Sequence, residues 1–108
     1  MTLKEYQQNA VRTARETEPG ERALLVAALG LSGEAGEFAE VVKKHIFHDH
    51  PLDRDKAIKV VGDVLWYVVQ ACTALGVELE EVAEANISKL KARYPEGFTP
   101  ERSFNRVL

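Results

Sequence analysis

The sequence predicts an all-α fold, an antiparallel four-helix bundle that assembles as a homo-oligomer. Apolar side chains recur at helical spacing along the 108 residues, and no stretch alternates apolar and polar residues as a half-buried strand does. Short connections between the helices favour antiparallel neighbours. Residues 60–77 are apolar nearly all round, and because so small a chain cannot bury them alone, they favour self-association.

Local signals place the first two helices. Thr2 and Glu5 form a capping-box pattern that opens a helix over about residues 3–16, which the following Pro-Gly pair ends. The second helix is expected over residues 21–48. It carries three glycines at spacing three, and these predict the close approach of another backbone or a local kink: Gly30, Gly33 and Gly36.

Cap signals also bound the later helices. Asp53 is the expected N-cap of a third helix that reaches Leu75, where Gly76 supplies the stop. A fourth helix is expected over residues 78–94 and is ended by a proline. The remaining residues, 96–108, are predicted to form an irregular tail within a single domain that spans residues 1–108.

The composition argues against nucleic acid as a partner and against a membrane location. A net charge of -3 supplies no broad basic field for nucleic acid backbones. Cys72 is the only cysteine and reads as a small core residue, and with no signal-peptide pattern at the start this fits the cytoplasm. The apolar stretch approaches the length of a membrane span, but Asp63, Gln70 and Thr73 interrupt it, so no membrane segment is expected.

Asp63 is the only charged residue from position 60 to 77. An unpaired buried carboxylate is costly, so we expect a compensating group nearby. Glu34 and Glu37 lie one helical turn apart on the preceding helix, and the three carboxylates together predict a magnesium site, which Mn²⁺ could also occupy. The alternatives are solvated glutamates and an aspartate bonded to a core side chain.

The histidines at the end of the second predicted helix suggest a second metal hypothesis. His45 and His48 are one turn apart and His50 follows, so zinc is conceivable. There is no cysteine cluster, and the residues adjoin a proline in an expected turn. Solvated or capping histidines are the commoner case.

The fourth predicted helix and the apolar stretch contain candidate ligand-binding residues. Asn86, Lys89 and Arg93 share one helix face that could hold phosphate, although a solvated face that complements the helix dipole is the usual explanation. Trp66 and Tyr67 could stack on a base, but in so apolar a stretch core or interface positions are more common.

Three blocks in this order resemble the MazG-like branch of the all-α nucleotide pyrophosphohydrolases. The resemblance covers about residues 24–98. The blocks are Gly33-Glu34-Ala35-Gly36-Glu37, then Gly62-Asp63-Val64-Leu65-Trp66-Tyr67, then Ala85-Asn86 with Lys89-Leu90 and Arg93-Tyr94-Pro95. In the family, a Glu-Glu-x-x-Glu block and a Glu-x-x-Asp block on the next helix bind magnesium. Glu34 and Glu37 match the last two acids of the first block, and Asp63 matches the aspartate of the second.

The chain departs from the family pattern at two positions. Gly33 stands at the first, variable glutamate of the first block, and Val60 stands at the glutamate of the second block. The resemblance implies magnesium-dependent hydrolysis of a nucleoside or deoxynucleoside triphosphate to the monophosphate and pyrophosphate, in nucleotide-pool house-cleaning. The loss of a carboxylate at Val60 leaves open an impaired family member that binds nucleotide as a sensor or subunit.

The resemblance also implies residue roles. Glu34 and Glu37 would be metal ligands and would orient or deprotonate the attacking water, with Asp63 as the third metal ligand. The implied substrate-binding residues are Asn86, Lys89, Arg93, Tyr94 and Trp66. The implied assembly is a dimer or tetramer.

Overall fold

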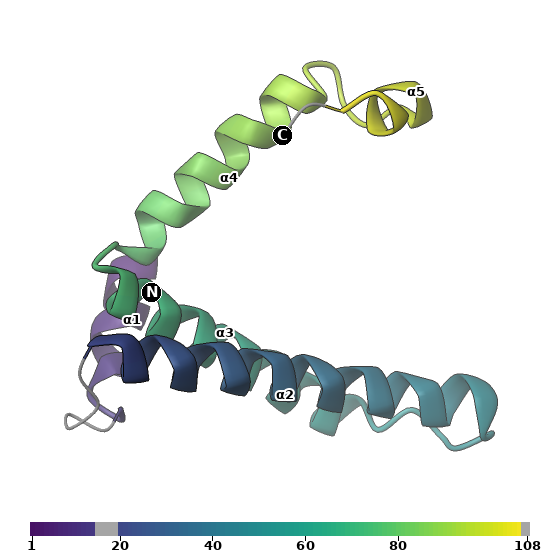
Figure 1. Cartoon of the computed structure of the whole chain (residues 1–108). Coiled ribbons are helices and arrows are strands. Elements are labelled where there is room, and N and C mark those ends of the chain that lie inside the picture. Colours follow the sequence, from purple (N-terminus) through teal and green to yellow (C-terminus); the bar gives the residue numbers. More distant parts are fainter. Residues whose placement is uncertain (15–19, 107–108) are drawn as a thin grey trace.

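The computed structural model describes residues 1–14 and 20–106, and five helices lie within them (Figure 1). The all-α prediction is confirmed. The helices are α1 (Leu3–Val11), α2 (Gly20–Phe47), α3 (Arg54–Leu75), α4 (Leu79–Arg93) and α5 (Pro100–Phe104).

The helices of a single chain do not close into the predicted antiparallel four-helix bundle. The long helices α2 and α3 form an antiparallel hairpin, and α1 packs on α3 near the open end of that hairpin. The fourth helix packs on α1 and α3 and then runs away from α2, so the molecule has two arms (Figure 1). Within the described residues, the single chain therefore leaves the bundle open.

The first helix begins as predicted and ends early. Thr2 Oγ1 accepts a hydrogen bond from the Glu5 backbone N–H at 3.1 Å, and Glu5 Oε1 accepts one from Thr2 N–H at 3.3 Å, which confirms the capping box. The predicted end near residue 16 is wrong, because α1 ends at Val11 and a turn follows in which the Thr13 hydroxyl donates to the Ala10 carbonyl. The Pro-Gly stop signal lies partly outside the described residues.

The boundaries of α3 and α4 agree with the sequence. Asp53 caps α3 by accepting a hydrogen bond from the Lys56 backbone N–H at 3.1 Å. Gly76 ends the helix in the left-handed region at φ 72°, a conformation that favours glycine. Within one residue at each end, α4 occupies the predicted range.

The prediction that residues 96–108 form an irregular tail is wrong in part, because they contain the short helix α5. Thr99 Oγ1 accepts a hydrogen bond from the Arg102 backbone N–H at 3.1 Å and caps α5, whose first residue is Pro100. Both residue types are favoured at these positions, so the sequence did carry a signal for a helix here.

A small core joins α1 to the bend between α3 and α4. Ala10, Val69, Cys72 and Leu79 are buried together. Gln7 on α1 fastens the bend, because its side chain accepts a hydrogen bond from the Leu79 N–H at 2.8 Å and donates one to the Val77 carbonyl at 3.3 Å. Burial raises the pKa of the Cys72 thiol, as expected for a core cysteine.

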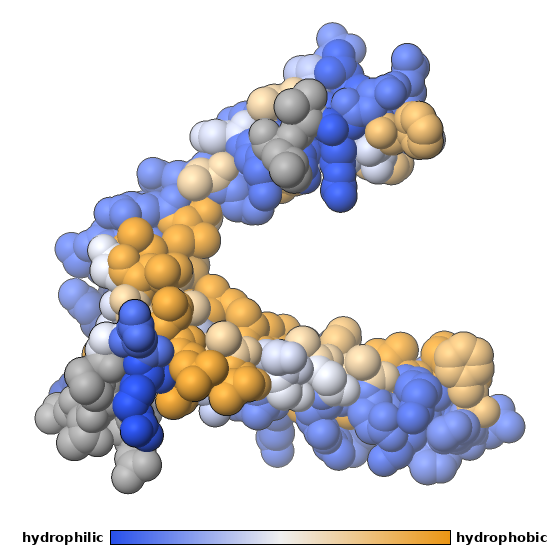
Figure 2. All heavy atoms as spheres, viewed as in Figure 1, coloured by the Kyte–Doolittle hydropathy of each residue, from blue (hydrophilic) through white to orange (hydrophobic). Residues whose placement is uncertain are grey.

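Large apolar side chains are exposed on every long helix. Figure 2 shows them gathered at the corner between the two arms and along the α2–α3 arm. The most exposed on the two long helices are Leu25, Leu29, Ile46, Phe47, Ile58, Val61 and Leu75. By length and composition alone, α3 is the one helix in the described ranges that could cross a membrane.

Gly30 on α2 lies directly against the ring of Tyr67 on α3. A Cβ built on Gly30 would overlap the ring of Tyr67, whereas a Cβ on Gly33 or Gly36 would meet nothing within 4 Å. A close neighbour is therefore present at one of the three glycines, and it is an aromatic side chain where the sequence predicted another backbone or a kink. The ring of Tyr67 also meets Trp66 edge-on, at 4.9 Å between centroids.

We expect Gly30→Ala to destabilise the protein by about 1–2 kcal/mol, because overpacking against Tyr67 outweighs the gain in helix propensity. Gly36→Ala is the matched control and should stabilise the protein by up to about 1 kcal/mol, since its site is open. Urea unfolding followed by circular dichroism measures both. Equal effects of the two substitutions would contradict the close approach.

Candidate functional site

Two contacts set the register of the α2–α3 hairpin. Tyr67 lies against Gly30, and about two turns further along α2 the Glu37 carboxylate pairs with the Lys56 ammonium at 3.2 Å. Residues 30, 34 and 37 share one stripe of α2, and residues 56, 60, 63 and 67 share one stripe of α3. The two contacts align these stripes in antiparallel register.

This register places the three predicted acids on the same stretch of the hairpin. Glu34 lies between the two contacts on α2, and Asp63 lies between them on α3. Within residues 1–14 and 20–106, however, no three His, Cys, Asp or Glu side chains lie close enough to hold a metal ion. One chain therefore brings the carboxylates to a common surface without bringing them together.

The predicted burial of Asp63 is wrong. Its side chain is exposed, and its neighbours Val61 and Leu65 are 51% and 39% exposed. Glu34 is half-buried and Glu37 is exposed. Val61 and Leu65 beside Asp63 thus face solvent in the single chain, and the carboxylate needs no internal partner there.

Val60, which stands where the second block of the family has a glutamate, is a buried apolar residue. Val60 is 5% exposed, and it lies on the α3 stripe between Lys56 and Tyr67. Oxygen donors from Glu34, Glu37 and Asp63 suit a hard divalent cation. One of them, Glu37, is shared with Lys56, so a cation at this carboxylate would compete with an ammonium.

Glu40 continues the acidic stripe of α2 but is neutralised locally. Its carboxylate pairs with Lys43 at 3.1 Å and with Lys44 at 3.9 Å. The hydrogen bond from Lys43 and its charge lower the pKa of Glu40. Glu40 is therefore a weaker candidate ligand than the three acids above.

The histidines give no support to the zinc alternative. His45 Nδ1–H donates to the His50 carbonyl at 2.9 Å, and the rings of His48 and His50 meet edge-on at 6.4 Å. All three are exposed. In the part of the chain that the structure describes, they belong to no metal-binding group.

The predicted phosphate-binding residues lie on the other arm. Asn86 and Lys89 are exposed on α4, Arg93 is half-buried at its end, and Tyr94 follows with its ring 5.4 Å from that of Phe98. Since α4 runs away from α2, the same chain does not bring these side chains to its own acids (Figure 1).

Trp66 makes structural contacts and also lines a cavity. Its indole N–H donates to Thr13 Oγ1 at 2.8 Å, and its ring packs against the buried cluster. With Tyr67 and Gln70 it lines a cavity of about 530 Å³ between α1 and the hairpin. The amide nitrogen of Gln70 is buried with no hydrogen-bond partner among the described residues.

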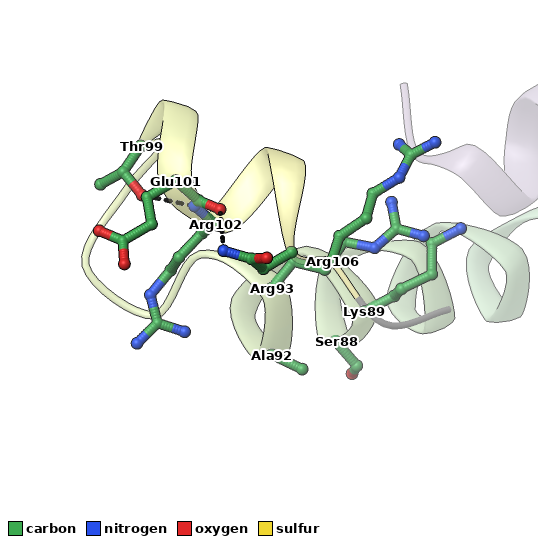
Figure 3. Close-up of a pocket in the computed structure, with 9 residues that line it drawn as sticks. Ser88, Lys89, Ala92, Arg93, Thr99, Glu101, Arg102 and Arg106 are labelled. Atoms are coloured by element: carbon green, nitrogen blue, oxygen red, sulfur yellow. Dashed lines mark hydrogen bonds between the residues drawn. The ribbon is translucent and has the colours of Figure 1, made fainter.

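Sequence reasoning missed two basic residues of the tail. Arg102 and Arg106 line a cavity of about 890 Å³ together with Lys89 and Arg93 (Figure 3). The available signal was the Thr-Pro cap of α5, which would have turned the tail into a defined element.

The chain belongs to the family of MazG nucleotide pyrophosphohydrolase domains, whose family model matches residues 23–98. Among individual proteins, it is similar to the Gene 37 protein of Mycobacterium phage L5, with 37% identity over 87 residues that cover 77% of this chain and 76% of that protein. No solved structure matches the chain.

Proposed function

We propose that the chain is a magnesium-dependent hydrolase that converts nucleoside or deoxynucleoside triphosphates to the monophosphate and pyrophosphate, in cytoplasmic nucleotide-pool house-cleaning. The observation that carries the proposal is the register of α2 and α3, which sets Glu34, Glu37 and Asp63 on one stretch of a family-matched hairpin. Hard oxygen donors of this kind are the usual ligands of magnesium.

The proposed roles fall on residues of both arms, with the metal ligands on α2 and α3 and most of the substrate-binding residues on or next to α4. Glu34, Glu37 and Asp63 would hold the cation, and the carboxylate of Glu34 or Glu37 would orient the attacking water and accept its proton. Bound magnesium would neutralise phosphate oxygens as charge develops. Lys89 and Arg93 would hold phosphate, Asn86 the sugar, and Tyr94 and Trp66 complete the proposed substrate-binding set.

A homo-oligomer fits this division, because the acids and the basic face of one chain do not meet. A second copy packed on the exposed apolar side chains of α2 and α3 would bury them and could bring a basic α4 to a neighbour's acids. We therefore propose a dimer or tetramer as the active form.

Leu29→Glu and Val61→Glu test the assembly. Both side chains are more than half exposed in the single chain, so a charge there should leave the monomer folded while it disrupts a subunit interface. We expect light scattering coupled to size-exclusion chromatography to report a smaller particle than the wild type. Phe104→Glu on α5, which is 89% exposed, is the control and should leave the mass unchanged. A monomeric wild type would overturn the proposed assembly.

A second candidate function has one specific observation in its favour. Val60 is buried where the family has a carboxylate, and Lys56 already pairs with Glu37. A site with one acid fewer and an ammonium in contact could bind nucleotide without efficient turnover. The chain would then be a sensor or a subunit of a larger assembly.

Product analysis separates the two functions. The purified protein is incubated with a panel of ribo- and deoxyribonucleoside triphosphates, with magnesium or with EDTA, and the products are resolved by ion-exchange chromatography. We expect monophosphate and pyrophosphate from at least one nucleotide only when magnesium is present. Nucleotide binding with no product from any member of the panel would favour the binding role.

A further inference from the structure

A cluster of cationic side chains lines the cavity between the end of α4 and α5 (Figure 3). Four of the chain's 14 Lys and Arg residues line it, in a molecule of net charge -3. Among the described lining residues, the cationic ones are Lys89, Arg93, Arg102 and Arg106, and the one carboxylate is that of Glu101. Like charges lining one cavity repel one another, and a bound anion would relieve the repulsion among Lys89, Arg102 and Arg106.

Local structure fixes the position of α5 relative to α4. After α4 ends, Gly97 adopts φ 91° and its N–H donates to the Tyr94 carbonyl at 3.1 Å. The rings of Tyr94 and Phe98 are in contact, and Thr99 caps the new helix. The chain is thereby turned so that Arg102 on α5 and Arg106, two residues beyond its end, line the same cavity as Lys89 and Arg93 of α4.

The charges are not evenly distributed around the cavity. In Figure 3 the side chains of Lys89 and Arg106 extend on the same side, while Arg102 extends at the opposite end, on the side of Glu101. The carboxylate of Glu101 offsets part of the positive charge near Arg102. The end of the cavity that holds Arg106 is therefore the stronger anion site.

We propose that this cavity is a polyphosphate-binding site in which Arg102 and Arg106 extend the phosphate contacts of Lys89 and Arg93. Guanidinium groups suit this role because their planar N–H donors match phosphate oxygens two at a time. Both arginines lie beyond residues 23–98 that the family model matches, so the α5 segment adds binding groups of its own. Taking the polyphosphate to be the triphosphate of the substrate rests on the proposed function.

The binding site is tested without metal or turnover. Inorganic tripolyphosphate is titrated by calorimetry into the full chain in EDTA at low ionic strength. We expect Arg106→Gln to weaken binding by about tenfold, Arg102→Gln by less, and the double variant by more than either. Lys91→Gln removes the same charge from α4 outside the cavity lining and should change binding by less than about twofold. Arg106→Lys keeps the charge and should fall between wild type and Arg106→Gln.

The outcomes separate this inference from the proposed hydrolysis. Unchanged binding by the double variant, or an equal loss from Lys91→Gln, overturns the site, provided that circular dichroism shows folded proteins. If wild type proves unable to hydrolyse nucleotides, the tripolyphosphate titration still decides whether the site exists. If it does hydrolyse them, the double variant should raise KM by about tenfold or more with a smaller change in kcat. An unchanged KM overturns the assignment to the substrate's triphosphate.

Discussion

Asp63→Asn is expected to reduce magnesium-dependent hydrolysis of a nucleoside triphosphate by about 100-fold or more, because the amide keeps the size of the side chain but removes a charged metal ligand. Asp63 is exposed in the chain, so its neutralisation should change the stability of the metal-free protein by no more than about 0.5 kcal/mol. The rise in melting temperature that magnesium produces in the wild type should disappear, since a ligand that binds only the folded state stabilises it.

Asp55→Asn is the matched control for this prediction. It makes the same chemical change on the same helix, at an exposed position in the first turn of α3. We expect Asp55→Asn to retain both activity and the magnesium-induced rise in melting temperature. An Asp63→Asn variant that hydrolyses nucleotide like the wild type would remove Asp63 from the metal site.

Val60→Glu is expected to be unstable without metal and rescued by it. Val60 is 5% exposed, so a carboxylate there should cost about 2 kcal/mol or more in EDTA, with partial relief from Lys56 one turn away. With magnesium the new oxygen donors would complete the family's second block. We expect the stability to recover and hydrolysis to rise by about tenfold or more over the wild type.

Val60→Gln is the control that separates the effect of the glutamate's charge from the effect of its size. The glutamine fills nearly the same volume and should lose stability with or without magnesium, with no gain in hydrolysis. Thermal unfolding in EDTA and in magnesium, combined with product chromatography, measures both variants. A Val60→Glu protein that binds nucleotide tightly but gains no hydrolysis would favour the binding role over an impaired enzyme.

Helix boundaries were predictable wherever a local hydrogen bond determines them. Asp53 and Gly76 act within a few residues of their own position, so their residue types are sufficient to place both ends of α3. The end of α1 depends instead on Thr13, which is held by Trp66 from 53 residues away in the sequence. No pattern within α1 could have indicated that contact.

The residues of the candidate site were predictable from the sequence, but how the surrounding apolar surface is covered was not. Spacing alone put Glu34 and Glu37 on one face of a helix, and the hairpin brings Asp63 to the same stretch. The exposed apolar residues beside Asp63 are the basis of the proposed self-association, and a periodic pattern does not distinguish cover by the same chain from cover by another. The exposure of Val61 and Leu65 shows that this chain does not supply it.

The contact between Gly30 and Tyr67 constrains how related sequences can diverge. A side chain at position 30 fits only if the residue at position 67 becomes smaller, so the two positions should change together among relatives. A lineage that acquires alanine first passes through a less stable protein, whereas one that first loses the ring does not meet this clash. The contact between α2 and α3 thereby favours one order of replacement, in which position 67 loses its ring before position 30 gains a side chain.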